Sequence, residues 1–340
     1  MLKRLLKWGA LFLIGLLLAG SAGLVWLYAD YQRFLQQPLA LDESVLLHVA
    51  PGDSLRRVAR DLQQRGLIDR PDYLIWHARH HDLATRIRAG EYQLTPGMTP
   101  QALLEKMVRG QVVQYGLTVI EGWTFRQMLA AVHAHPQIVP TLEGQSDEAI
   151  MAAIDRPGHH PEGLFLPDTY LFPRGTTDLD FLRRANRALE QVLEREWAAA
   201  DTDALPLQAP YEALILASII ERETGHVDER ERVAGVFVRR LQRGMRLQTD
   251  PTVIYGLGPD FEGRLRTRHL RTDTPYNTYT RHGLPPTPIA LPGRASIRAA
   301  LNPVDGDELF FVSRGDGSHH FSATYAEHRR AVRRYILGQE

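Results

Sequence analysis

Two acidic residues close an otherwise apolar run and are the first candidates for chemistry. Residues 217–225 read ASIIERETG, so Glu221 and Glu223 stand one residue apart just before a glycine. On a helix that turns about 100° per residue, Glu223 lies in line with Leu216 and Ile220, whereas Glu221 points roughly 160° away. The two carboxyl groups are therefore predicted to face different surroundings and not to share one cleft.

The surroundings predicted for Glu223 suit a general acid. Burial among apolar groups disfavours a carboxylate and raises its pKa, and the partial negative charge at a helix C-terminus acts in the same direction. A carboxyl group that stays protonated near neutral pH can donate a proton to a leaving group. The alternative is that both glutamates are solvated at a frayed helix end and pair with Arg222, Arg230 or Arg232.

Polar and aromatic residues gather in three downstream stretches, interleaved with prolines. The stretches read RLQTDPTVIYGLG, TPYNTYTRHGLPPTPIALPG and AALNP, and they contain Gln248, Thr249, Asp250, Thr252, Tyr255, Tyr276, Asn277, Tyr279, Thr280 and Asn302. Aromatic faces can cover the apolar side of sugar rings, and amide and hydroxyl groups can bond their polar substituents. Prolines stiffen loops and reduce the entropy lost on binding. The pattern is typical of a groove for a neutral sugar polymer; turn formers with structural prolines would give the same composition.

The elements that must hold this site are predicted to be mainly helical, within a domain that covers residues 115–340. An amphipathic helix is predicted from about residue 179 to 197, and Pro210 is a favourable first residue for the helix that carries the glutamates. A further helix is predicted within residues 227–245, with a cap near Asp228. Residues 161–177 are rich in proline, glycine and aromatic residues and are predicted to form an ordered loop.

A small α+β module is predicted for residues 44–114. An alternating strand leads through a Pro-Gly turn into a helix that Asp53 or Ser54 can cap and that Gly66 ends, and the same plan recurs up to Gly110. The stretch HVAPGDSLRRVARDL resembles the first strand and helix of a LysM module, an envelope domain that binds glycan. The resemblance implies either glycan binding or the same packing without affinity for sugar.

The N-terminus predicts a membrane anchor. Residues 1–7 carry three basic side chains, and residues 8–29 form an uncharged run long enough to span a bilayer as a helix. Its length, the aromatic residues at both ends and the acidic Asp30 favour retention over cleavage as a signal peptide. The charge pattern predicts a cytoplasmic tail at residues 1–7, a connector at residues 30–43 and everything beyond outside the cytoplasm.

Composition excludes several classes of protein. Lys and Arg number 40, as do Asp and Glu, so the chain lacks the basic excess of a nucleic-acid binder. Cysteine is absent, which excludes disulfides and thiolate metal sites. Histidines occur in small groups, but His77 and His81 lack the glutamate of a His-Glu-x-x-His zinc motif. No metal or other cofactor is expected. His320, near the end of the chain, is predicted to be a surface residue.

Taken together, these motifs resemble a known family, the endolytic murein transglycosylases, also called YceG-like membrane-bound lytic transglycosylases. ASIIERETG, RLQTDPTVIYGLG, TPYNTYTRHGLPPTPIALPG and AALNP stand in the order and spacing of that family, and EGLFLPDTY matches a further segment. The resemblance covers nearly the whole chain. It implies an enzyme of the bacterial inner membrane, single-pass with its N-terminus inside, a carbon–oxygen lyase that acts on polysaccharide.

The resemblance also implies the reaction and its residues. The family cleaves the β-1,4 bond between N-acetylmuramic acid and N-acetylglucosamine within peptidoglycan strands and leaves 1,6-anhydro-muramyl ends. Its catalytic glutamate matches Glu223, with Glu221 in reserve. Ordinary glycosidases use two carboxyl groups, but here the 6-hydroxyl of the sugar replaces water, so one suffices. The groove residues would orient the sugars, and a penicillin-binding synthase is the protein neighbour that the family implies.

Three other readings remain. A hydrolytic muramidase would need a second carboxylate across the bond, for which Asp250 is the nominee. A non-enzymatic envelope scaffold would only bind glycan. A metal enzyme is the weakest alternative, because adjacent histidines on a strand face opposite ways. The products of digestion distinguish the first from a transglycosylase, and a Glu223→Gln variant distinguishes the second.

Overall fold

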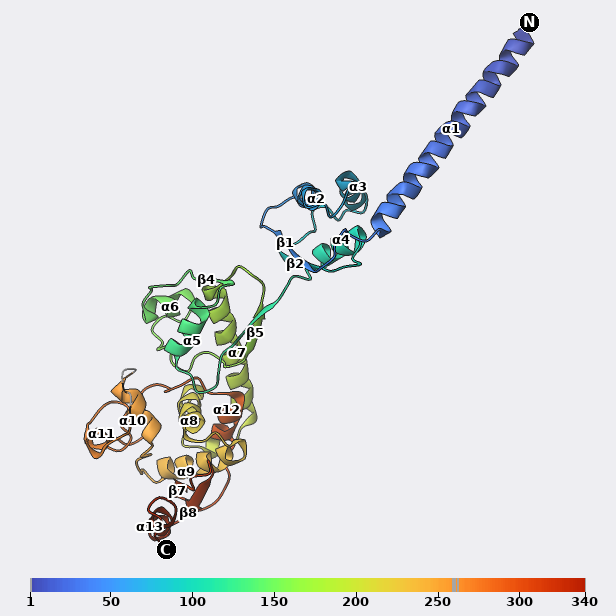
Figure 1. Cartoon of the computed structure of the whole chain (residues 1–340). Coiled ribbons are helices and arrows are strands. Elements are labelled where there is room, and N and C mark those ends of the chain that lie inside the picture. The colour runs from blue at the N-terminus through green and yellow to red at the C-terminus, as the bar shows by residue number, and fades with distance from the viewer. Residues whose placement is uncertain (1, 259–260, 262, 340) are drawn as a thin grey trace. The chain divides into compact units, whose positions relative to one another are not determined.

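The computed structural model describes residues 2–258, 261 and 263–339 and combines helices with short strands (Figure 1). The predicted α+β class is confirmed. Contacts divide the chain into two compact units, which are described separately. The N-terminal unit runs to residue 115 and includes residues 172–175, and the C-terminal unit comprises residues 116–171 and everything from residue 176 onward.

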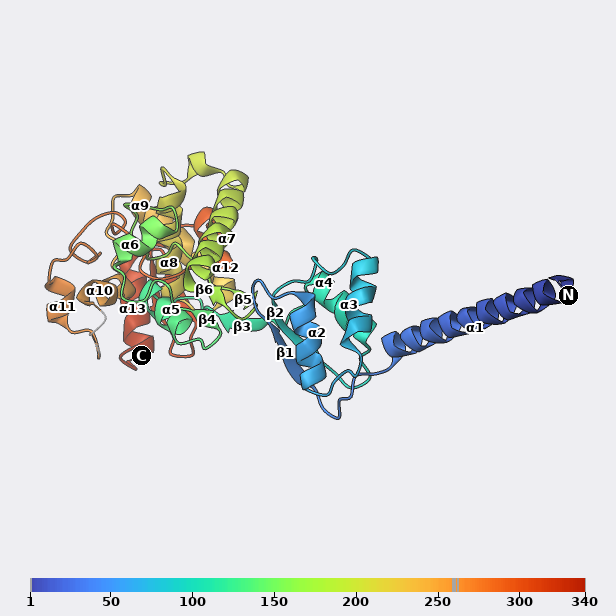
Figure 2. The same cartoon turned by 90° about the horizontal axis from the view of Figure 1, so that it is seen from above.

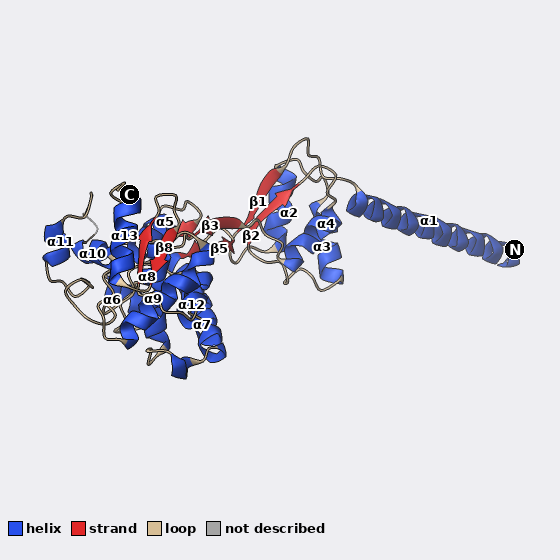
Figure 3. Ribbon diagram, turned by 90° about the horizontal axis from the view of Figure 1, so that it is seen from below, coloured by secondary structure: helices blue, strands red, loops and turns tan. Residues whose placement is uncertain are grey.

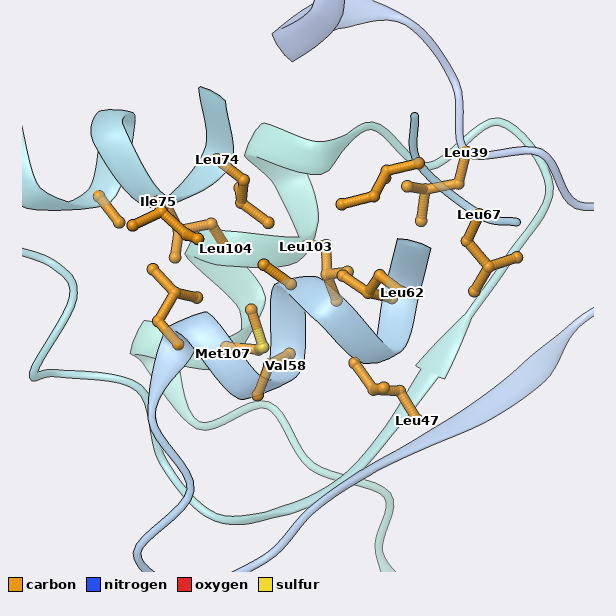
Figure 4. Close-up of a cluster of buried hydrophobic side chains, with 14 of the residues drawn as sticks. Leu39, Leu47, Val58, Leu62, Leu67, Leu74, Ile75, Leu103, Leu104 and Met107 are labelled. Carbon is orange, nitrogen blue, oxygen red and sulfur yellow. The ribbon is translucent and has the colours of Figure 1, made fainter. Parts of the chain in front are cut away.

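The N-terminal unit is a helical layer on one antiparallel strand pair. Its elements are α1 (Leu2–Gln36), β1 (Val45–Val49), α2 (Leu55–Gln64), α3 (Pro71–His80), β2 (Gly90–Leu94) and α4 (Pro100–Arg109). Strands β1 and β2 pair with Leu47 opposite Tyr92, and both side chains are buried. Leucines from α2, α3 and α4 close the core above the strands (Figure 4).

Capping residues fix the starts of the helices in this unit, as the sequence predicts. The Ser54 hydroxyl accepts a hydrogen bond from the backbone N–H of Arg57 at the start of α2, and Thr99 does the same for α4. Gly110 ends α4 in the left-handed region, with φ of 67°, which a glycine adopts without a steric cost.

Helix α1 is the single described helix that is long and apolar enough to cross a membrane, over Lys7–Gln36 with a mean hydropathy of 2.3. Figure 2 shows it as one uninterrupted helix. It continues to Gln36, past the end of the predicted span at residue 29 and into the predicted connector. The reason is that Tyr31, Phe34 and Leu35 are buried in the core of the N-terminal unit, so packing extends the helix.

The C-terminal unit is mostly helical, and its strands form only two-stranded sheets (Figure 3). Its elements, with β3 and β5 at the boundary between units, are β3 (Tyr115–Thr118), α5 (Phe125–His133), β4 (Ile138–Val139), α6 (Asp147–Ala153), β5 (Thr169–Phe172), β6 (Thr176–Thr177), α7 (Asp178–Ala199), η1 (Thr202–Ala204), α8 (Pro210–Glu223), η2 (Val227–Glu229), α9 (Arg230–Gln242), α10 (Asp250–Leu257), α11 (Thr267–Arg271), α12 (Arg294–Leu301), β7 (Phe310–Ser313), β8 (His319–Ser322) and α13 (Tyr325–Tyr335). Strand β3 pairs with β5, β4 is parallel to β6, and β7 is antiparallel to β8.

Helix α8 is the centre of the C-terminal unit, packed against α7, α9, α10 and α12 (Figure 1). Pro210 stands at its first position, as predicted, and every residue from Ala213 to Ile220 is buried. A helix that is apolar all round is a core helix. Inside it, the Ser218 hydroxyl donates to the carbonyl of Ile215 and accepts a hydrogen bond of 3.0 Å from the N–H of Ile289.

Three local predictions differ from the structure. The predicted cap near Asp228 is wrong, because residues 227–229 form a 3-10 turn and α9 starts at Arg230 with Glu229 before it. The stretch RLQTDPTVIYGLG, predicted as a stiff loop, contains the short helix α10. The predicted loop at 161–177 contains β5, because Tyr170 and Phe172 alternate into the core and favour a strand.

Candidate active site

Glu223 is the last residue of α8 and carries a half-buried carboxyl group that has no cationic partner within ion-pair distance in the described chain. Its Oε2 accepts a hydrogen bond of 2.6 Å from the Thr249 hydroxyl. Burial raises the pKa of Glu223, and the nearby charge of Asp250 acts in the same direction. The hydrogen bond from Thr249 and the charges of His319 and Arg240 oppose this rise without cancelling it.

Glu221 has a different environment although it lies one residue away. Its side chain is only 5% exposed, and Oε1 lies 3.0 Å from Nη2 of Arg230, whose side chain is 8% exposed. Oε2 accepts a hydrogen bond of 2.9 Å from the N–H of Gly293. Glu221 therefore has a buried, ion-paired side chain that ties α8 to α9 and to the start of α12, and Arg230 is one of the three arginines named as possible partners from the sequence.

The predicted apolar stripe does not distinguish Glu223 from Glu221, because both faces of α8 are apolar and buried. The distinguishing feature is what lies opposite each carboxyl group: a guanidinium for Glu221, and a hydroxyl together with an acidic neighbour for Glu223. An opposite charge stabilises a carboxylate, whereas burial without one favours the protonated acid.

Residues 248–250, which lie beside Glu223, are held in place by hydrogen bonds with residues 278–279. Gln248 has φ of 51°, a rare value for a residue other than glycine, and its N–H donates to the carbonyl of Thr278. The N–H of Thr249 donates to the Thr278 hydroxyl over 3.1 Å. The Tyr279 hydroxyl donates to Oδ1 of Asp250 over 2.6 Å, and burial raises the pKa of Tyr279. These contacts bring Gln248, Thr249, Asp250 and Tyr279 together beside Glu223.

Two of the predicted groove residues are buried beneath this surface. The Thr252 hydroxyl donates to the carbonyl of Thr249, and Asn277 donates to three carbonyls and accepts a hydrogen bond of 2.8 Å from the N–H of Tyr279. Both residues are at most 1% exposed. Their contacts hold the surface residues in place, so a direct contact with sugar stays a prediction for each.

Asn302 does not join the residues beside Glu223. It caps the C-terminus of α12, and its side chain donates to the carbonyl of Arg298 over 2.9 Å. It lines a cavity of about 510 Å³ together with Arg239 and Gln242, which shares no lining residue with the cavity beside Tyr255. The Thr280 hydroxyl donates to Oδ1 of Asp273 over 2.8 Å and has no hydrogen bond to Glu223 among the described residues.

Tyr255 and Tyr276 line a cavity of about 640 Å³ between α5, α8 and α10. Their rings meet edge to face with centroids 4.9 Å apart. At the wall of the cavity the Tyr255 hydroxyl donates to Oε2 of Glu162 over 3.2 Å, and the N–H of Phe125 donates to Oε1 over 2.9 Å. Burial raises the pKa of Glu162 to about 7.

Sequence reasoning missed Glu162 and His319. Glu162 opens the stretch EGLFLPDTY, in which no carboxyl role was expected. His319 on β8 lies beside Glu229, with 2.8 Å between Nδ1 and Oε2, and its charge lowers the pKa of Glu223. The sequence drew attention to the neighbouring His320, whose ring instead lies against Tyr335. The two partners of the His319 pair are 90 residues apart, so no local pattern could have joined them.

No group of three or more potential ligands gathers as a metal site among the residues that the structure describes. The arrangement can instead perform proton transfer: one buried acid without a cation, a hydroxyl that orients it, and a tyrosine–aspartate pair alongside.

Comparison with known proteins identifies the family of the chain. The model of the YceG-like family matches residues 47–334. The chain belongs to the YceG-like family. This YceG-like protein is 29% identical over 326 residues to a Bacillus subtilis protein named endolytic murein transglycosylase, covering 90% of this chain and 89% of the relative. It is 24% identical to a Streptococcus pneumoniae protein of the same name, covering 96% of this chain and 64% of that longer relative.

A solved structure agrees with this assignment. The crystal structure of a YceG-like protein from Listeria monocytogenes matches the YceG-like chain with a TM-score of 0.52 and 26% identity. The match covers 85% of this chain and 99% of the Listeria chain. The similarity therefore extends over both compact units and is not confined to the stretches around Glu223.

Proposed function

We propose that this YceG-like protein is a lytic transglycosylase that cuts within the glycan strands of peptidoglycan. The names of the curated relatives support the reaction class. The observation that carries the proposal is the carboxyl group of Glu223, which is half-buried, forms no ion pair with any described residue and has a raised pKa. The finer statement is that it breaks the β-1,4 bond between N-acetylmuramic acid and N-acetylglucosamine and leaves a 1,6-anhydro-muramyl end.

The proposed reaction uses one carboxyl group twice. Protonated Glu223 donates its proton to the glycosidic oxygen, so the bond from that oxygen to the anomeric carbon breaks and the leaving sugar departs as an alcohol. The carboxylate that remains accepts the proton of the 6-hydroxyl as that oxygen attacks the same anomeric carbon. The acid is thereby restored, and no water is consumed. The Thr249 hydroxyl, which donates to the carboxyl group over 2.6 Å, orients it for this transfer.

The residues around Glu223 are proposed to hold the sugars. Tyr279 and Asp250 form a bonded pair that can present hydroxyl and carboxylate oxygens to polar substituents, and Tyr255 and Tyr276 offer aromatic surface. The Asp250 charge also favours the positive charge that develops at the anomeric carbon. Thr252 and Asn277 support these residues from beneath.

The cellular setting is proposed from α1 and the family. A single-pass anchor in the bacterial inner membrane, with the basic N-terminal tail inside, would place both units on the outer side of that membrane. An anchored enzyme that cuts within strands could limit their length while penicillin-binding synthases extend them. The LysM-like stretch of the N-terminal unit is proposed to pack as such a module does, with glycan binding as a separate hypothesis.

The test is digestion of purified sacculi by the wild-type chain and by Glu223→Gln, with Glu221→Gln alongside, followed by mass spectrometry of the products. We expect anhydro-muramyl products from the wild type and a loss of at least about 100-fold with Glu223→Gln, the scale of removing a general acid. Products with reducing ends would favour a muramidase in which Asp250 holds a water. Full activity of Glu223→Gln together with loss in Glu221→Gln would refute the assignment.

A further inference from the structure

The cavity beside Tyr255 contains positive charge that the fold leaves without a carboxylate partner. Arg126 on α5 and Arg222 on α8 both line the cavity, both are exposed, and neither forms an ion pair in the described chain. Among the described residues, the one hydrogen bond of these two guanidinium groups runs over 3.2 Å from Arg222 to the carbonyl of Gly122. In contrast, Arg230 on the next helix is buried against Glu221.

The cavity has the size and lining of a ligand site. Its volume of about 640 Å³ lies within the range of small-molecule pockets. One wall is built from the Tyr255 and Tyr276 rings, and the Glu162 carboxyl fixes Tyr255 from behind through a hydrogen bond of 3.2 Å. Glu162 is only 4% exposed, and both of its oxygens already accept hydrogen bonds. A wall held by a buried acid is rigid before any ligand arrives.

Helices α8 and α10 each contribute residues both to the cavity and to the surroundings of Glu223. Arg222 is the residue before Glu223 on α8, and α10 contributes Asp250 beside Glu223 and Tyr255 to the cavity. Tyr255 follows Asp250 by five positions on α10, a rise of about 7 to 8 Å along the helix axis. A strand cut at Glu223 would therefore bring a neighbouring sugar unit, together with its substituents, to the cavity.

We propose that this cavity is a subsite for the peptide stem of a muramyl unit, with Arg126 and Arg222 pairing with the carboxylates of the stem. The inference rests on the proposed function, because it takes peptidoglycan as the substrate. Peptide stems are the acidic part of this otherwise neutral polymer, and a guanidinium binds a carboxylate in a two-pronged geometry. The apolar parts of the stem would lie against Leu129, Ile254 and Phe261 in the lining of the cavity, beside the Tyr255 and Tyr276 rings that are proposed to hold the sugar.

Two acidic groups also face the cavity and limit where a stem carboxylate can lie. Asp147, at the start of α6, is exposed to solvent, and Glu162 lies behind Tyr255. His160 completes the titratable lining. The carboxylates of a stem are therefore expected on the side of α5 and α8, where Arg126 and Arg222 lie, and away from Glu162. This arrangement selects where an acidic stem points as well as whether it binds.

The test compares two substrates and uses the full chain in detergent. Glycan strands with intact stems are cut alongside strands from which an amidase has removed the stems. We expect the wild type to cut stem-bearing strands with the higher kcat/KM. The Arg126→Gln/Arg222→Gln double variant should lose about tenfold on stem-bearing strands, the scale of a charged hydrogen bond, and should match the wild type on stripped strands.

Two control variants separate charge recognition from damage to the fold. Arg187→Gln removes an exposed arginine of α7 that lines neither cavity, and it should behave as the wild type on both substrates. The Arg126→Lys/Arg222→Lys double variant keeps both charges and should retain part of the preference that the glutamine double variant loses. Equal loss on both substrates in the double variant, or a wild type that does not distinguish them, would overturn the subsite.

A binding measurement separates this inference from the proposed reaction. Stem-bearing and stripped glycan oligomers are titrated calorimetrically into the Glu223→Gln chain, with and without the two arginine substitutions. Tighter binding of the stem-bearing oligomer that disappears with the substitutions supports the subsite even if the wild type cuts neither strand, in which case only the proposed reaction fails. Equal affinity for both oligomers refutes the subsite even if cleavage is observed.

Discussion

The two neighbouring glutamates should respond in opposite ways when each is replaced by glutamine. Glu221 is ion-paired with Arg230 at 3.0 Å in a site where both side chains are under a tenth exposed. Removing one partner of a buried pair costs about 3–5 kcal/mol. Glutamine keeps an oxygen for the N–H of Gly293, and Arg230 keeps Glu121 at 3.4 Å, so the expected loss is about 2–3 kcal/mol. At about 2–4 °C per kcal/mol, Tm should fall by about 5–10 °C.

Glu223→Gln should leave the unfolding free energy unchanged or raise it. The wild-type carboxyl has a raised pKa, so between its ordinary value of 4.5 and the folded value the native state binds more protons than the unfolded state. Stability contributed by this group therefore falls as pH rises through that window. Glutamine does not ionise, so the variant escapes this loss. Its Tm relative to the wild type should increase from about pH 5 to about pH 7.5.

The assay is thermal unfolding of the full chain in detergent, followed by near-ultraviolet circular dichroism at both pH values. Glu231→Gln serves as the control, because Glu231 is exposed on α9 without an ion pair and should change stability by less than about 0.5 kcal/mol. A Glu223→Gln variant that loses as much stability as Glu221→Gln would refute the reasoning, since it would mean that the Glu223 carboxylate is stabilised by the fold.

Three further predictions address single contacts. Thr249→Val removes the hydrogen bond that opposes the raised pKa of Glu223, so the alkaline limb of the activity profile should move to higher pH, while Thr249→Ser should restore it. Because the pKa of Glu162 is raised from 4.5 to about 7, the contribution of this group to the unfolding free energy should fall as pH rises across that range. Glu162→Gln should flatten that part of the stability profile, measured by denaturant unfolding. Tyr279→Phe, which leaves Asp250 without its 2.6 Å donor, should lower kcat/KM by about tenfold on sacculi with an unchanged Tm.

Local rules predicted most of the helices in this protein. Ser54, Thr99 and Gly110 stand at helix ends because their side chains or backbone freedom meet the needs of those positions, and these needs depend only on nearby sequence. The helix that carries Glu223 was predicted in the same way, from Pro210 at its start to the glycine after its end. Its burial on all sides was not, because that depends on four other helices.

The partners of the candidate site could not be predicted, because they come from distant segments. Glu162 meets Phe125 from one helix and Tyr255 from another, across separations of 37 and 93 residues. The stretches around Asp250 and Asn277 were expected to line a groove, but the sequence could not say which side chains face solvent. Thr252 and Asn277 bond backbone carbonyls inside the protein, a role that composition does not distinguish from ligand binding.

The start of α9 explains how one helix end can carry two glutamates with different partners. Because residues 227–229 form a 3-10 turn, α9 begins at Arg230, whose guanidinium pairs with Glu221. The same positive charge beside Glu223 would lower its pKa and remove the proton that the proposed reaction needs. Under the proposed reaction, the placement of one arginine beside Glu221 therefore distinguishes the two glutamates, which burial of the helix alone does not.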